Sequence, residues 1–137
     1  QGFIYFLQED WERAQFIQHR LMQFYHIREL RDYEKVAQIR LHCAKVIVPR
    51  SGRVELKIEN IESYNPHVQY WWWIYKIVRN RSDIKTYWNN AKQVSTPKIW
   101  DLALYKILEH LASLQYCSAI RVGLLSEVRE RFQQRFK

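Results

Sequence analysis

Apolar residues recur on a helical period through the first third of the chain. One stripe follows spacings of three and four residues, as one face of an α-helix does, and comprises Leu7, Trp11, Ala14, Ile17, Leu21 and Tyr25. A second stripe follows after a shift near Ile27 and comprises Leu30, Tyr33, Ala37, Leu41, Ala44 and Val48. Residues 3–48 contain no Gly or Pro, the two residues that most destabilise a helix. The pattern therefore predicts one helix, or two helices joined at a bend near Ile27.

This helical segment has a length that bears on function. In extended form it would measure about 70 Å at 1.5 Å per residue, whereas a small domain is only some 30 Å across. We therefore expect residues 1–48 to form an N-terminal helical arm that lies against a neighbouring subunit or a polyanion. Residues 49–137 are expected to form a helical bundle, with both parts belonging to one domain.

The rest of the chain shows one exception to helical patterning. Val54, Leu56 and Ile58 alternate with charged residues, a period of two that predicts a short strand within residues 53–59. Beyond it, the pairs Asn65-Pro66 and Thr96-Pro97 each predict a helix start, because Asn and Thr cap helices and Pro suits the first turn. The predicted fold is mainly α, with at most one short β segment.

The charge balance points to an anionic partner. The 137 residues include 22 Lys and Arg but only 14 Asp and Glu, for a net charge of +8. A strongly basic domain is typical of proteins that bind phosphates, although a basic stripe can also be plain solvated surface. The cations that we expect to contact nucleic acid are Arg13, Arg20, Arg28, Arg31, Lys35, Arg40 and Lys45 on the arm, and Lys76, Arg79 and Arg81 beside the tryptophans.

Three consecutive tryptophans stand at the centre of the chain. On a helix, Trp71, Trp72 and Trp73 would point about 100° apart, so they cannot all enter one core. They could stack on bases, but Trp more often anchors a protein interface. We therefore expect Trp71, Trp72 and Phe132 to contact neighbouring subunits.

Candidate catalytic residues are sparse. Glu55 and Lys57 form a Glu-x-Lys element of the kind that metal-dependent nucleases carry on a strand, with Asp32 as a conceivable second metal ligand. Cys43, Cys117 and the five histidines lack the close spacing of a zinc site. We expect no enzymatic activity and no cofactor, and we keep the nuclease as a minor alternative.

Two features concern location. No apolar run approaches the roughly 20 residues of a membrane span. The opening segment 1–7 also lacks the basic region and apolar core of a signal peptide. We therefore expect a chain that neither spans a membrane nor is secreted.

A basic, mostly helical chain with a long N-terminal arm ahead of a bundle is similar in plan to the major capsid proteins of filamentous archaeal viruses. In that family the arms wrap double-stranded DNA and the bundles form the wall of a helical filament. The resemblance implies a coat that binds duplex DNA without sequence specificity and assembles with copies of itself or a related chain. It also implies a place in a virion or an intracellular nucleoprotein.

A second, shorter resemblance is to lentiviral Vif proteins, which are basic, tryptophan-rich adaptors between host deaminases and a ubiquitin ligase. The residues that resemble this family are Ser118, Ala119, Ile120, Arg121, Leu124 and Leu125, together with Leu102, Ala103 and Leu104. The cysteines and histidines of that family's zinc site have no counterpart here. This resemblance implies a protein–protein adaptor as the alternative to a nucleic-acid coat.

Overall fold

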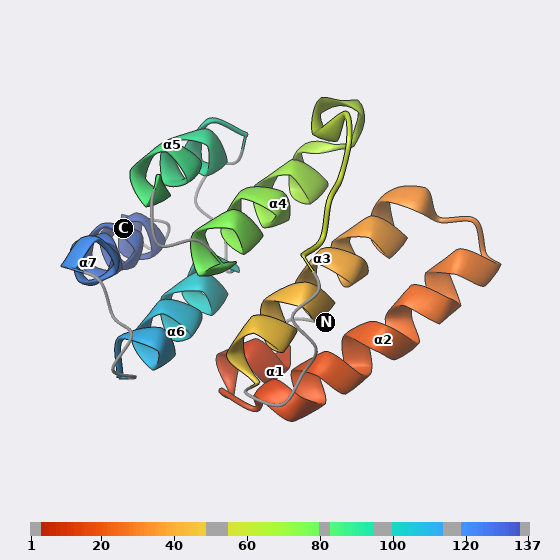
Figure 1. Cartoon of the computed structure of the whole chain (residues 1–137), viewed down its shortest axis with the longest axis horizontal. Helices are drawn as coiled ribbons and strands as arrows, with labels where there is room; N and C mark the ends of the chain where they lie inside the picture. The colour runs from red at the N-terminus through yellow and green to blue at the C-terminus, as the bar shows by residue number, and fades with distance from the viewer. Residues whose placement is uncertain (1–3, 49–54, 80–82, 95–99, 114–118, 135–137) are drawn as a thin grey trace.

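The computed structural model describes residues 4–48, 55–79, 83–94, 100–113 and 119–134. These residues are mainly helical, which confirms the predicted fold class (Figure 1). The helices are α1 (Ile4–Leu7), α2 (Trp11–Ile27), α3 (Arg31–Ile47), α4 (Pro66–Arg79), α5 (Ile84–Val94), α6 (Trp100–Ser113) and α7 (Ala119–Gln134), with a short 3-10 helix, η1 (Ile61–Ser63), before α4. Among the described residues, every helix is too short or too polar to cross a bilayer.

The first third of the chain folds back on itself. α2 ends at Ile27, which confirms the bend predicted there, and α3 then runs antiparallel to α2 at its side (Figure 1). Each helix has 17 residues, so each measures about 25 Å. The N-terminal helical unit is thus a hairpin that packs on α4 through α3, and the extended form of some 70 Å is not adopted.

The hairpin turn is a helix C-cap of the Schellman type without glycine. Glu29 takes a left-handed conformation, with φ of 56°. Its N–H donates to the carbonyl of His26 at 3.1 Å, and the N–H of Leu30 donates to the carbonyl of Tyr25 at 3.0 Å. These two bonds satisfy the last carbonyls of α2 and reverse the chain. Gly usually occupies this position, so its absence conceals the turn in the sequence.

The same device joins α1 to α2. Glu9 has φ of 58°, and the N–H of Asp10 donates to the carbonyl of Tyr5 at 2.9 Å. Asp10 then caps α2, because its carboxylate accepts a hydrogen bond from the N–H of Arg13 at 3.2 Å. Both turns within the described residues 4–48 therefore use a left-handed Glu.

The core is built around α4, which lies between α3 and α5 (Figure 1). Eight of its 14 residues are buried, so apolar neighbours surround the helix on several sides. Trp71 contacts the ring of Phe6 with a centroid separation of 5.9 Å. α6 and α7 pack on each other and complete the bundle at the other end of the molecule (Figure 1).

The predicted strand is wrong for the residues that the structure describes. Residues 55–60 belong to neither a helix nor a strand, and Asn60 is left-handed with φ of 55°. Residues 53 and 54 lie outside the described part of the chain. The N–H of Leu56 donates to the hydroxyl of Tyr75 at 2.9 Å in place of a partner strand. The alternation correctly indicates the sides of the segment, since Leu56 is buried whereas Glu55 and Lys57 are exposed.

Candidate nucleic-acid interface

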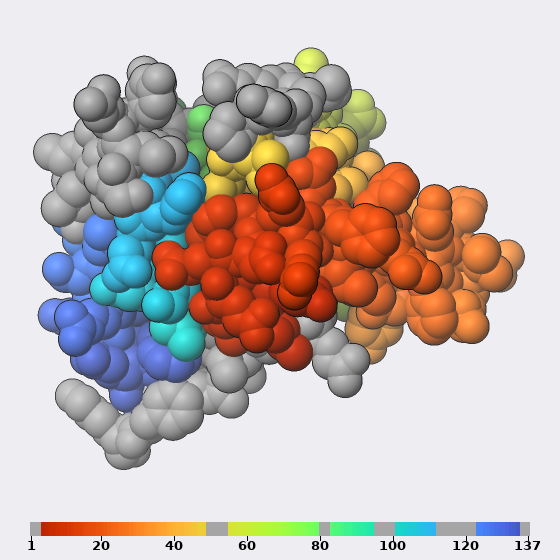
Figure 2. Space-filling model, turned by 90° about the horizontal axis from the view of Figure 1, so that it is seen from below, coloured from red at the N-terminus to blue at the C-terminus, as the bar shows by residue number. Residues whose placement is uncertain are grey.

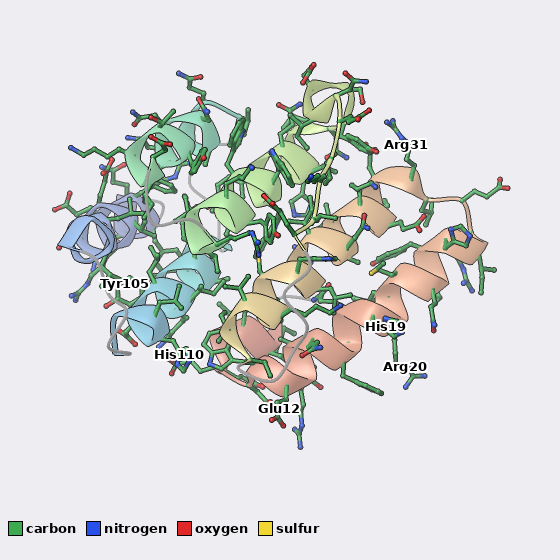
Figure 3. The ribbon with its side chains drawn as sticks, viewed as in Figure 1. Glu12, His19, Arg20, Arg31, Tyr105 and His110 are labelled. Carbon is green, nitrogen blue, oxygen red and sulfur yellow. The ribbon has the colours of Figure 1, made fainter. Side chains whose placement is uncertain are left out.

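Between Arg13 and Arg28 the outer face of α2 is basic and free of acids. From Arg13 to Arg28 the sequence contains no Asp or Glu. Arg13, Arg20 and Arg28 are all exposed, and Figure 3 shows Arg20 pointing away from the body of the molecule. Their spacings of seven and eight residues correspond to about 10 Å and 12 Å along the axis, within a sector of about 80°. α2 therefore presents a row of cations to solvent.

Phenylalanines alternate with two of these arginines, at every fourth residue. Phe16 and Phe24 are 61% and 45% exposed. The Arg20 Cζ lies 5.7 Å from the centroid of the Phe16 ring, and the Arg28 Cζ lies 3.6 Å from that of Phe24. Arg28 Nη1 also donates to the Phe24 carbonyl at 3.4 Å. We call Phe16, Arg20, Phe24 and Arg28 the Phe–Arg ladder.

The ladder suits a phosphate backbone. Each ring holds a guanidinium in place by a cation–π contact, which reduces the side-chain entropy lost on binding. A guanidinium presents several N–H donors in a planar fork and pairs with phosphate oxygens bidentately. The exposed rings add surface on which sugars or unpaired bases can pack. Sequence analysis selected Arg20 and Arg28 but missed Phe16 and Phe24, although their spacing from the arginines was visible.

The interface has an acidic limit at the start of α2. Glu9, Asp10 and Glu12 line a cavity of about 540 Å³ together with Trp11 and His110, whose rings lie 5.1 Å apart between centroids. Figure 3 shows Glu12 and His110 at this end of the hairpin, with Arg20 further along α2. Arg13 Nε lies 3.4 Å from the Asp10 carboxylate. These carboxylates disfavour a polyanion beyond Arg13.

Two predicted cations lie on the opposite edge of the hairpin. The Arg31 Cζ lies 4.0 Å from the centroid of the Tyr64 ring, and Arg31 Nη2 donates to the Ser63 hydroxyl at 3.2 Å. Lys35 Nζ is 5.8 Å from the same ring. Figure 3 places Arg31 on the outer side of α3 and Arg20 on the outer side of α2, which are opposite edges of the hairpin. The predicted cations of residues 1–48 therefore do not form a single face.

Arg40 was expected to contact phosphate, and this prediction is wrong because the side chain is enclosed. Only 7% of Arg40 is exposed. Its Cζ lies 4.6 Å from the Trp71 ring centroid, and its Nη2 lies 3.2 Å from His67 Nε2. Burial lowers the pKa of Arg40 to about 10. Burial, followed by the charge of Arg40, lowers the pKa of His67 to about 4, so His67 is neutral at pH 7.

The remaining predicted cations are dispersed. Lys45 is half-buried on α3. Lys76 Nζ lies 5.1 Å from the Trp72 ring centroid, and Arg79 Nε lies 3.9 Å from Glu55 Oε1. Arg81 lies outside the described residues. Lys76 and Arg79 thus pack on the fold and do not extend the row on α2.

The tryptophans contribute to the core of this chain. Trp71 is 0% exposed and Trp72 is 6% exposed, so the prediction that they contact another subunit is wrong. Both side chains are buried because other helices pack against more than one side of the central helix α4. Trp73 is half-buried and stacks on Tyr87, with ring centroids 6.0 Å apart. Phe132 on α7 is also half-buried.

The structure does not bring the nuclease candidates together. Asp32 accepts a hydrogen bond from the N–H of Asn65, just before α4, whereas Glu55 lies beside Arg79 at the end of α4. These two ends are about 20 Å apart along the helix. Within the described parts of the chain, no three His, Cys, Asp or Glu side chains are grouped as metal ligands would be.

The residues that resemble the adaptor family are buried or half-buried where the structure describes their side chains. Ala103 and Leu104 on α6 and Leu124 on α7 are buried, whereas Leu102 and Leu125 are half-buried. Ser118 lies outside the described residues, as do the side chains of residues 119–121. Buried positions stabilise the bundle and are not available to a partner in this conformation.

Comparison with models of protein families, with curated proteins and with solved structures finds no match to this chain. Function is therefore inferred from the geometry of the described residues. The exposed row on α2 is the feature of that geometry with the clearest chemical specificity.

Proposed function

We propose that this chain is a structural protein that binds nucleic acid through the outer face of α2 and coats it by self-association. The Phe–Arg ladder is the observation that carries the proposal, because an acid-free row of exposed arginines and aromatic rings suits a sugar–phosphate backbone. The net charge of +8 adds long-range attraction to a polyanion. No enzymatic step is part of this function.

Arg13, Arg20 and Arg28 contact phosphates in this proposal, and Phe16 and Phe24 pack beside the backbone. Contacts to phosphate carry no sequence information, so binding is independent of base sequence. Duplex DNA is the proposed ligand, as in the capsid proteins of filamentous archaeal viruses that the chain resembles in plan. The corresponding location is a virion or an intracellular nucleoprotein.

The proposal is tested by fluorescence anisotropy with a labelled duplex of mixed sequence, and with one of its strands alone, over a series of salt concentrations. Each phosphate contact contributes about 0.9 to the slope of log affinity against log salt on duplex DNA, and about 0.7 on a single strand. The triple variant Arg13→Gln, Arg20→Gln, Arg28→Gln should lower the affinity and the slope. The two ligands show which form of nucleic acid is preferred.

A matched control removes the same charge elsewhere. Lys57, Lys85 and Arg129 are exposed and lie on the connection before α4, on α5 and on α7. Changing all three to Gln lowers the net charge equally but leaves the face of α2 intact. Equal losses of affinity in the two triple variants would show that only total charge matters, and would overturn the assignment of the site to α2.

A further inference from the structure

The turn between α2 and α3 exposes several large apolar side chains. Phe24 is 45% exposed, Ile27 77%, Leu30 38% and Tyr33 58%. We call these four residues the hairpin tip. Figure 2 shows the hairpin extending beyond the rest of the molecule, so other elements of the chain do not cover this end in that view. Soluble monomers seldom expose a large contiguous apolar patch unless it binds something.

The tip is one continuous surface. The rings of Phe24 and Tyr25 lie 5.6 Å apart between centroids, and those of Tyr25 and Tyr33 lie 5.5 Å apart. Leu30 adjoins the same group, since its N–H donates to the carbonyl of Tyr25 at 3.0 Å. Aromatic contacts therefore link Phe24 of α2 through Tyr25 to Tyr33 of α3.

The tip is also held in a fixed conformation. The Schellman bonds of Glu29 and Leu30 close the turn. His26 Nδ1 lies 3.1 Å from Glu34 Oε2 and links the last turn of α2 to the first turn of α3. A surface that is ordered before binding loses little entropy when a partner covers it.

We propose that a second copy of this chain covers the hairpin tip, so that two hairpins meet tip to tip across a two-fold axis near Ile27. The inference rests on the self-association in the proposed function but not on nucleic-acid binding. Both signs of charge follow Ile27 in the turn, since Arg28 and Glu29 are consecutive exposed residues. In a two-fold contact the same patch faces itself, so Arg28 of each copy can pair with Glu29 of the other.

Charge also favours a second copy of the chain over a membrane or a nucleic acid as the partner of the hairpin tip. An anionic membrane or a nucleic acid would be repelled by Glu29, which stands beside the most exposed apolar residue of the tip, Ile27. Ile27 and Leu30 also lack aromatic rings on which bases could stack. Phe24 belongs to both the tip and the Phe–Arg ladder, and Arg28 of the ladder is next to Ile27 in the sequence. A tip-to-tip contact would therefore bring the basic faces of two copies together.

The first test is sedimentation equilibrium of the purified chain without nucleic acid. The wild type should show a concentration-dependent dimer, and Ile27→Gln should weaken dimerisation at least tenfold. Phe16→Gln is the matched control, because Phe16 is 61% exposed on the same helix but lies outside the tip. Far-UV circular dichroism checks that each variant is folded. Equal weakening by both variants would overturn the proposal.

Charge exchange tests the two-fold geometry. Arg28→Glu and Glu29→Arg should each weaken the dimer, because each places like charges opposite one another in both pairs. The double variant exchanges the two signs and should restore dimerisation to near the wild-type level. A double variant that dimerises no better than the single variants would contradict a tip-to-tip contact.

Other occupants give different outcomes. If the wild type stays monomeric at every concentration but co-sediments with phosphatidylserine vesicles, and Ile27→Gln abolishes that binding, the tip binds a membrane and the proposal of a second copy is overturned. A wild type that dimerises through the tip but binds neither duplex nor single-stranded DNA would support this inference and overturn the nucleic-acid part of the proposed function.

Discussion

Arg131 Nε donates a hydrogen bond to Asp101 Oδ2 at 3.0 Å, and the two side chains are only 11% and 0% exposed. Tyr70 donates its hydroxyl proton to the other carboxylate oxygen of Asp101. Burial, followed by the charge of Asp101, raises the pKa of Tyr70. The Arg131 Cζ also lies 5.4 Å from the Trp88 ring centroid on α5. One buried ion pair thus links α6 and α7 to the central helix and to α5.

Asp101→Asn should destabilise the fold by about 3 kcal/mol, because it leaves the Arg131 charge buried without its counter-ion. Urea denaturation measures the free energy of unfolding. Tyr70→Phe removes only a hydrogen bond to the same carboxylate and should cost less, about 1–2 kcal/mol. A larger loss for Tyr70→Phe would show that the ion pair is not the dominant interaction.

Glu9→Gly should raise the free energy of unfolding by about 1 kcal/mol, because glycine adopts positive φ without the steric cost that Glu pays. Glu9 has φ of 58° at the turn between α1 and α2. Glu12→Gly is the matched control: Glu12 lies within α2, where the same change should cost about 1 kcal/mol. Thermal or urea denaturation should show that Glu9→Gly raises the free energy of unfolding and Glu12→Gly lowers it. Changes of the same sign in both variants would contradict the left-handed turn at Glu9.

Stability should fall as the pH decreases from about 6.5 towards 4. Burial lowers the pKa of His67 from 6.5 to about 4, and burial also lowers the pKa of His42. Because the pKa is lower in the folded state, the unfolded chain takes up the proton first as the pH falls. The contribution of the neutral histidine to the free energy of unfolding is therefore complete above about pH 6.5 and is lost on acidification. Denaturation curves measured across this range should show a smaller decline for His67→Gln than for the wild type. If the free energy of unfolding falls equally with pH in His67→Gln and in the wild type, His67 is not the main cause of the pH dependence.

Arg20→Gln should reduce the slope of log affinity against log salt on duplex DNA by about 0.9. Arg31→Gln removes the same charge but should leave the slope nearly unchanged, because Arg31 lies on the opposite edge of the hairpin and is held by Ser63 and Tyr64. Anisotropy titrations at several salt concentrations measure both slopes. Equal slope changes would indicate that nucleic acid contacts both edges of the hairpin.

The sequence by itself determined the helical character and several local features. The spacing of apolar residues indicated the helices, because side chains three and four residues apart lie on the same face of a helix. Asn65 caps α4 as predicted, with its side-chain oxygen accepting the Val68 N–H at 3.0 Å. The alternation of residues 55–58 marked which side faces the core. The cations of the candidate interface, Arg13, Arg20 and Arg28, were likewise selected from charge and spacing.

Only the tertiary structure decided which of these features are exposed. The hairpin depends on left-handed Glu9 and Glu29, a conformation that their residue type disfavours and that packing and capping bonds must therefore stabilise. Arg40 belongs to the same basic pattern as Arg20, yet the packing of α3 on α4 encloses it whereas the outer face of α2 stays open. Periodicity describes the faces of a helix, but contacts between distant residues decide which face is covered.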